Sequence, residues 1–151
     1  MNPVEGLLAA LRRSREFFFK HVDRFGDDSW DVRIAPGTMT ARETLRHLLV
    51  DDRAALKSLQ TNADPNYEAL GIDETDPTKL KALLFASHAE LLQALAERQD
   101  EVSINVWGTN KPLVEGLTWY ASEDFYHAGQ LAMILLAINP EWQYYPDIYG
   151  G

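Results

Sequence analysis

The sequence predicts an all-α protein: a four-helix bundle with a crossover loop before the last helix. Four long segments carry leucines and other apolar residues at the spacing of three and four that gathers them on one helix face. Helix-capping signals precede three of these segments. Since 151 residues suffice for one domain with a full hydrophobic core, we expect residues 1–151 to form a single bundle domain.

The first two helices begin at recognisable caps. Asn2-Pro3 combines an N-cap with a first-turn proline, and we expect the helix that it opens to run to about Phe25. Thr40 and Glu43 form a capping box, because the threonine oxygen and the glutamate carboxylate can each accept a hydrogen bond from the other's backbone amide. This box predicts a second helix over about 41–61.

The last two helices flank a less regular segment. Asp76-Pro77 repeats the cap-and-proline signature and predicts a helix over about 77–99. Residues 102–112 alternate weakly between apolar and polar and predict an irregular or hairpin-like crossover. A long apolar segment predicts the last helix over about 113–138. We expect the aromatic tail that follows to close over a site, to pack against the first helix or to contact a second subunit.

Charge and cysteine content exclude several classes of function. The formal net charge of -9 repels phosphate backbones and no cluster of lysine or arginine offsets it, so we expect no nucleic-acid partner. The absence of cysteine excludes disulfides, zinc–thiolate sites and a protein thiolate nucleophile. The sequence has no signal-peptide pattern and no apolar run of membrane-spanning length. We therefore expect a cytoplasmic protein without a membrane partner.

One stretch of the last predicted helix points to chemistry. Glu123 and His127 are four residues apart, so they lie one above the other on the same helix face. Five apolar residues fall on the same side of the helix as His127 and indicate that this face is buried: Leu117, Tyr120, Leu131, Ile134 and Ile138. A carboxylate and an imidazole that face a core need either hydrogen-bond partners or a metal ion. The spacing leaves both interpretations of the pair open.

Spacing also leaves open which residue would be a third ligand. The second helix offers His47, Asp51 and Asp52. His47 lies roughly 160° from the mean direction of the leucine stripe, whereas Asp52 falls within that stripe. Periodicity alone therefore favours Asp52 as the polar residue that faces inward. The other two histidines, His21 and His88, have no second ligand type nearby, and we expect them to be structural or surface residues.

Several short motifs resemble the DinB-like family over most of the chain, from the first helix through the last. They are Trp30, Pro36-Gly37, the segment Thr40-Ala-Arg-Glu-Thr-Leu-Arg-His47 and the segment Tyr126-His127-Ala-Gly-Gln130. Members of that family are four-helix bundles that hold nickel or zinc on three histidines, one in the second helix and a His-x-x-x-His pair in the last. His47 and His127 match two of these positions, and Glu123 occupies the third.

The resemblance implies a divalent-metal site made of His47, Glu123 and His127. The metal would be Zn, Ni, Mn or Fe, and the glutamate favours the harder ions over nickel. Characterised relatives are transferases and isomerases that use small thiols such as mycothiol or bacillithiol. Since this chain has no cysteine, the resemblance implies an exogenous thiol and a small-molecule substrate. Asp51 or Asp124 would orient a metal-bound imidazole, and no catalytic residue is assigned.

A non-catalytic bundle is the alternative hypothesis. In it Glu123 and His127 form a buried hydrogen-bonded pair within a degenerate metal site, and the protein binds a small ligand or serves in a stress response. Exposed aromatic side chains would form the interface of a homodimer. The cost of turning such polar groups inward without use favours the metal-dependent enzyme. We expect a homodimer under either hypothesis.

Overall fold

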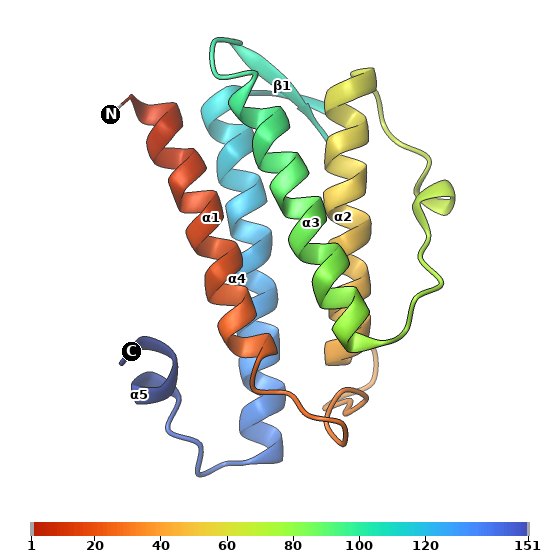
Figure 1. The fold of residues 1–151 in the computed structure, drawn as a ribbon, viewed down its shortest axis with the longest axis vertical. Helices are drawn as coiled ribbons and strands as arrows, with labels where there is room; N and C mark the ends of the chain where they lie inside the picture. The colour runs from red at the N-terminus through yellow and green to blue at the C-terminus, as the bar shows by residue number, and fades with distance from the viewer. Residues whose placement is uncertain (1, 151) are drawn as a thin grey trace.

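The computed structural model describes residues 2–150, in which four long helices form a bundle (Figure 1). These helices are α1 (Pro3–Val22), α2 (Ala41–Thr61), α3 (Pro77–Ala96) and α4 (Leu113–Ile138). The smaller elements are the 3₁₀ helix η1 (Tyr67–Leu70), the strands β1 (Ser103–Val106) and β2 (Thr109–Pro112), and the C-terminal helix α5 (Tyr144–Tyr149). The predicted bundle is confirmed, and the segment before α4 is the hairpin-like crossover.

The helix starts follow their caps, whereas two helix ends differ from the prediction. Thr40 and Glu43 form the complete capping box before α2, and the bounds of α2 and α4 are as predicted. The prediction that the first helix reaches Phe25 was wrong, because α1 ends at Val22. The amides of Arg24 and Phe25 bond to carbonyl oxygens three residues back, which tightens the chain into turns. For the same reason α3 ends at Ala96 rather than near residue 99.

The hairpin β1–β2 closes one end of the bundle, at the top of Figure 1. Its strands pair antiparallel from Ser103 opposite Pro112 to Val106 opposite Thr109. The two turn residues, Trp107 and Gly108, have φ values of 47° and 87°. Positive φ at both positions is the geometry of a type I′ turn, which matches the twist of the two strands. Trp107 can therefore reach back from the turn to α2, where its Nε1 donates a hydrogen bond to a backbone carbonyl.

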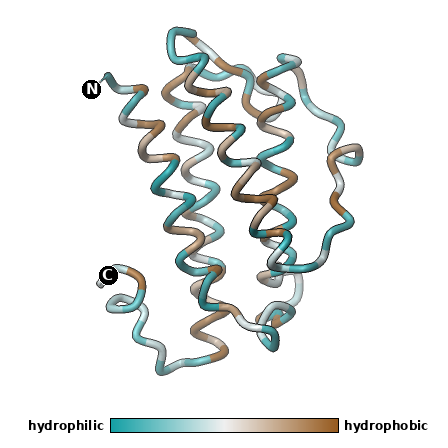
Figure 2. Tube along the Cα trace, viewed as in Figure 1, coloured by the Kyte–Doolittle hydropathy of each residue, from teal (hydrophilic) through white to brown (hydrophobic). Residues whose placement is uncertain are grey.

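The bundle consists of two helix pairs with a hydrophobic core at each end. α1 packs mainly on α4 and α2 mainly on α3, whereas α2 and α4 make few direct contacts. Hydrophobic stretches recur along all four helices in Figure 2. The hairpin-end core comprises Leu8, Leu11, Ala55, Leu59, Leu91, Leu92, Leu95, Ile104, Val106, Leu113, Leu117 and Tyr120. The opposite core, called here the loop-end core, includes Phe18, Val22, Phe25, Trp30, Leu45, Leu48, Leu49, Leu80, Leu84, Leu131 and Ile134.

The aromatic tail packs against the first helix, which is one of its three expected roles. Ile148 of α5 is buried, and the ring of Tyr149 lies 5.6 Å from that of Phe17 in α1. His21 is 0% exposed, and its Nε2 lies 3.2 Å from the hydroxyl of Tyr144. The tail therefore supports α1 on the outside of the bundle. Within residues 2–150, no helix has the length and apolar character needed to cross a membrane.

Candidate metal centre

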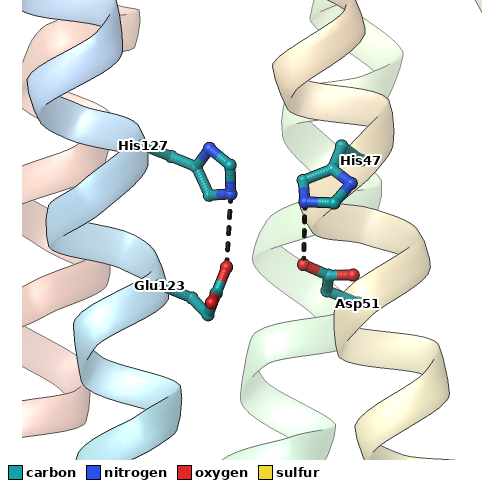
Figure 3. A group of neighbouring side chains, drawn as sticks. All are labelled: His47, Asp51, Glu123 and His127. Atoms are coloured by element: carbon teal, nitrogen blue, oxygen red, sulfur yellow. Dashed lines mark ion pairs between the residues drawn. The ribbon is translucent and has the colours of Figure 1, made fainter. Parts of the chain in front are cut away.

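Two histidines and two carboxylates meet between α2 and α4 (Figure 3). His47 and Asp51 project from α2, and Glu123 and His127 project from α4. One ligand atom from each of the four side chains lies within 4.8 Å of the others, so the cluster could hold a metal ion. The structure thus brings together the three residues that the sequence singled out and adds Asp51 to them.

Each histidine of the cluster lies against a carboxylate one turn away on its own helix. His47 Nε2 lies 3.1 Å from Asp51 Oδ2, and His127 Nε2 lies 3.3 Å from a carboxylate oxygen of Glu123. The two imidazole rings face each other across the gap between the helices, with centroids 4.8 Å apart and planes inclined at 68°. Both Nε2 atoms and both carboxylates therefore converge on one space, and a single ion in that space could contact all four groups.

The four side chains differ in their exposure to solvent. The side chain of His127 is 3% exposed, whereas that of His47 is 41% exposed. Glu123 and Asp51 lie between these extremes. The cluster therefore has a buried floor at His127 and an open side at His47. A small molecule can approach an ion in the cluster from the open side, while the floor keeps one ligand fixed.

The buried imidazole of His127 has the hydrogen bonding of a metal ligand. Its Nδ1 lies 2.7 Å from Oε1 of Gln130, and an amide oxygen only accepts, so Nδ1 carries the proton. In the neutral form of the ring, Nε2 then carries the lone pair. Among residues 2–150 this Nε2 is buried without a hydrogen-bond partner, and a carboxylate oxygen of Glu123 lies 3.3 Å from it. A buried ring nitrogen with a free lone pair fits a metal ion, which would satisfy it.

The charges of the cluster also suit a divalent cation. The contact with His127 lowers the pKa of Glu123 and outweighs the effect of burial, so this carboxyl group is ionised near neutral pH. The hydrogen bond to Asp51 raises the pKa of His47, again against burial. An imidazole that is stabilised in its protonated form beside carboxylates occupies a region of negative potential. A divalent cation would replace the proton there.

The structure explains why periodicity pointed to Asp52 rather than His47. Asp52 is indeed buried, but its carboxylate binds Arg15 of α1 and does not reach the cluster. The α2 helix contacts its neighbours on two sides: the leucine stripe faces the cores, and the edge that carries His47 and Asp51 faces α4. A single mean direction of hydrophobicity cannot represent two such faces, so the resemblance was needed to select His47.

Two expectations about neighbouring residues need correction, and a third is confirmed. Asp124 does not orient a metal-bound imidazole, because it points to α1 and binds Arg15 and Ser14. Ile138 is 45% exposed rather than buried, since it is the last residue of α4 and follows the final core layer. His21 and His88 were expected to be structural or surface residues, and both are structural, since each ring contacts a backbone carbonyl of α1.

Two contributors to the site region had weak signals in the sequence. Gln130 lies three residues after His127, on the same side of the helix, and its amide oxygen holds the imidazole. Arg15 stands in the apolar stripe of α1, between Leu11 and Phe18 at helical spacing, and this position marks it as an inward-facing cation. Such an arginine needs a buried carboxylate partner, which Asp52 could have supplied.

Comparison with known proteins identifies one family. A model described as the DinB superfamily matches residues 10–131, a region that contains α2, α3, the hairpin and most of α1 and α4. Both halves of the cluster, His47 with Asp51 and Glu123 with His127, lie within the matched region. No curated protein matches the chain.

Proposed function

Because the chain belongs to the DinB superfamily, we propose that it is a divalent-metal-dependent enzyme whose metal is held by His47, Glu123 and His127, with Asp51 as a fourth ligand. The reaction that we propose is a transfer or isomerisation that uses an exogenous small thiol. In the transfer, the thiol loses its proton, its sulfur bonds to an electrophilic carbon of the substrate, and the leaving group departs with a proton.

One observation carries the proposal: a buried imidazole nitrogen that has no hydrogen-bond partner among residues 2–150 adjoins three other ligand side chains. Leaving such a nitrogen unsatisfied costs free energy, on the order of 1–3 kcal/mol. A metal ion removes that cost and balances the carboxylates at the same time. Nitrogen and oxygen donors without sulfur favour zinc, manganese or iron as the ion.

The residues of the site have distinct roles in this proposal. A bound ion would supply Lewis acidity and lower the pKa of a thiol or a water molecule in its coordination shell. Gln130 fixes the tautomer and the orientation of His127 through Nδ1. The exposed side of the cluster at His47 leaves room for the thiol and the substrate to enter. Since residues 1–151 contain no cysteine, the sulfur nucleophile comes from solution.

Elemental analysis by plasma mass spectrometry, on protein purified without an affinity tag, tests the proposal. We expect about one equivalent of Zn, Mn, Fe or Ni in the wild-type protein and none in Glu123→Ala. Glu115→Ala is a matched control, because Glu115 is an exposed glutamate of α4 outside the cluster. If Glu123→Ala keeps a full equivalent, Glu123 is not a ligand. If the wild-type protein takes up no metal on titration, the proposal fails.

The non-catalytic dimeric bundle is supported by a different feature. Several large side chains on the outer surface of α4 and the tail are exposed: Phe125, Tyr126, Met133 and Tyr145. Large exposed apolar patches mark interfaces in other proteins, and these side chains supply the exposed apolar area that this alternative requires. Under this alternative the protein is a homodimer, and EDTA leaves its melting temperature unchanged. Thermal unfolding with and without EDTA therefore separates the two functions.

A further inference from the structure

A buried ion-pair layer crosses the middle of the bundle. Arg15 of α1 donates two hydrogen bonds to Asp52 of α2, at 2.8 and 2.9 Å, and a third from Nε to Asp124 of α4, at 3.0 Å. The three side chains are 6%, 4% and 2% exposed. Ser87 of α3 lies 2.6 Å from Asp52, and Ser14 of α1 lies 2.8 Å from Asp124. All four helices therefore meet in one polar layer.

This polar layer separates the two hydrophobic cores. On each helix the residues of the hairpin-end core lie on one side of the layer and those of the loop-end core on the other. In α1, for example, Leu11 precedes Arg15 and Phe18 follows it. Apolar contacts are non-directional and tolerate sliding of one helix along another, whereas a hydrogen-bonded ion pair permits one alignment. The layer can therefore fix the relative heights of the helices.

The same layer adjoins both halves of the metal cluster. Asp52 is the chain neighbour of Asp51, and Asp124 is the chain neighbour of Glu123. The α2 and α4 helices, which supply these halves, make few direct contacts. Arg15 binds the neighbouring aspartate on each helix and so spans the distance between the two halves.

A second, weaker link joins the two halves at the hairpin. Trp107 Nε1 donates a hydrogen bond to the backbone carbonyl of Asp51, and its ring lies against Tyr120 of α4. This link is a neutral hydrogen bond and a ring contact. Charge-assisted bonds such as those of Arg15 are roughly twice as strong as neutral ones. Trp107→Phe, which keeps an aromatic ring and removes the donor, measures the contribution of the hairpin.

We infer that Arg15 is a positioning residue for the metal centre. Its guanidinium sets the spacing and the register of α2 against α4, so that four ligands from two helices reach a single ion. The planar fork is essential, since it binds one carboxylate with two parallel bonds while Nε reaches another. Lysine would keep the charge but has no such fork. This inference rests on the proposed metal site and extends it to a residue that touches neither metal nor substrate.

Zinc affinity of the purified protein, measured by competition with a chromophoric chelator, provides the first test. We expect Arg15→Lys to weaken zinc binding at least tenfold, the effect typical of residues that support metal ligands. Arg13→Lys, an exposed arginine of the same helix, should bind zinc as the wild type does. Leu95→Ala, in the hairpin-end core, destabilises the fold and should also keep its zinc affinity. Equal loss in Leu95→Ala would assign the effect to stability and overturn the inference.

A measurement without metal provides the second test. The chain has no cysteine, so Lys57→Cys in α2 and Thr118→Cys in α4, both at exposed positions, would carry the only two spin labels. Pulsed electron paramagnetic resonance then reports the distance between α2 and α4. We expect a narrow distribution with Arg15 present and a broader or shifted one in Arg15→Lys. Should Arg15→Lys fail to fold, Asp124→Asn, which removes the charge of one arm, is measured in its place.

The two tests distinguish failure of the inference from failure of the proposed function. Weaker zinc binding together with a broadened distribution in Arg15→Lys supports both. Wild-type affinity or an unchanged distribution in Arg15→Lys overturns the positioning role. If the wild-type protein binds no zinc but the distribution broadens in the variant, Arg15 sets the helix register and the proposed metal function is wrong.

Discussion

At the scale of single residues, the candidate centre depends on what its buried histidine touches on the side away from the other ligands. His127 is held there by Gln130, which lies 2.7 Å from its Nδ1. A ring fixed in this way loses little rotational freedom when a metal binds. The residues that set the orientation of the ligands are therefore as important to the site as the ligands.

Gln130 gives a direct test of this view. Gln130→Ala removes the acceptor at Nδ1 of His127, so the ring can rotate and change its tautomer. We expect zinc affinity to fall about 10- to 100-fold, with little change in unfolding free energy. Gln130→Glu keeps an acceptor at the same place and should restore the affinity. Chelator competition measures both variants, and equal affinities of wild type and Gln130→Ala would contradict this role.

His88 should make stability depend on pH in a predictable direction. Burial, followed by the positive charge of Arg15, lowers the pKa of His88 from 6.5 to about 4 in the folded protein. The unfolded chain therefore binds the proton more readily, and folding loses stability as pH falls from about 6.5 to about 4. The loss attributable to His88 amounts to about 3 kcal/mol at most.

The pH dependence of His88 is isolated by comparison with His88→Gln, using urea unfolding between pH 4 and 7. Burial raises the pKa of Asp124 to about 6, so Asp124 contributes stability at low pH that is lost as pH rises through 6. This opposite contribution is shared by both proteins and cancels in their difference. The stability advantage of the wild type over His88→Gln should shrink as pH falls. A constant difference would show that His88 is not responsible.

At the scale of elements, the hairpin depends on the backbone conformation of a single residue. Gly108 has a φ of 87°, and a Cβ atom there would lie 2.6 Å from Asp64 Cβ and 2.9 Å from its Cα. We expect Gly108→Ala to destabilise the protein by about 1–3 kcal/mol, through strain in the turn and displacement of the segment that carries Asp64. Urea unfolding measures the change.

Gly129 is the matched control for the turn glycine. It lies within α4, and a Cβ there would meet no atom within 4 Å. Gly129→Ala should stabilise the protein by about 0.5–1 kcal/mol, because alanine loses less backbone entropy in a helix than glycine does. If both substitutions destabilise the protein equally, the turn conformation of Gly108 is not the cause of its effect.

Elements were more predictable from the sequence than the way they face one another. Capping residues determine where a helix begins, so Thr40 and Glu43 placed the start of α2 correctly. No equally strong signal ends α1, where hydrogen bonds to carbonyl oxygens three residues back continue the chain into turns after Val22. Periodicity found Glu123 with His127, which share one helix face. It could not find His47, whose side chain meets α4 at the edge of its own helix.

At the scale of the whole molecule, the bundle joins two hydrophobic cores through a layer of charge. Each core takes residues from all four helices, and Arg15 of α1 binds Asp124 within its own helix pair and Asp52 in the other pair. This layer was not predictable from local patterns, since its three charged members come from α1, α2 and α4 and only the fold brings them together. The metal cluster lies beside this layer, because Asp51 and Glu123 directly precede Asp52 and Asp124 in the chain.

Anomalous X-ray diffraction from crystals grown with zinc, measured on both sides of the zinc absorption edge, tests the central claim most directly. We predict one strong anomalous peak between α2 and α4, about 2.0–2.1 Å from a ring nitrogen of His47 and of His127 and within bonding distance of Glu123. Absence of a peak there, or a peak only at residues outside the cluster, would contradict the assignment of this site as a metal centre.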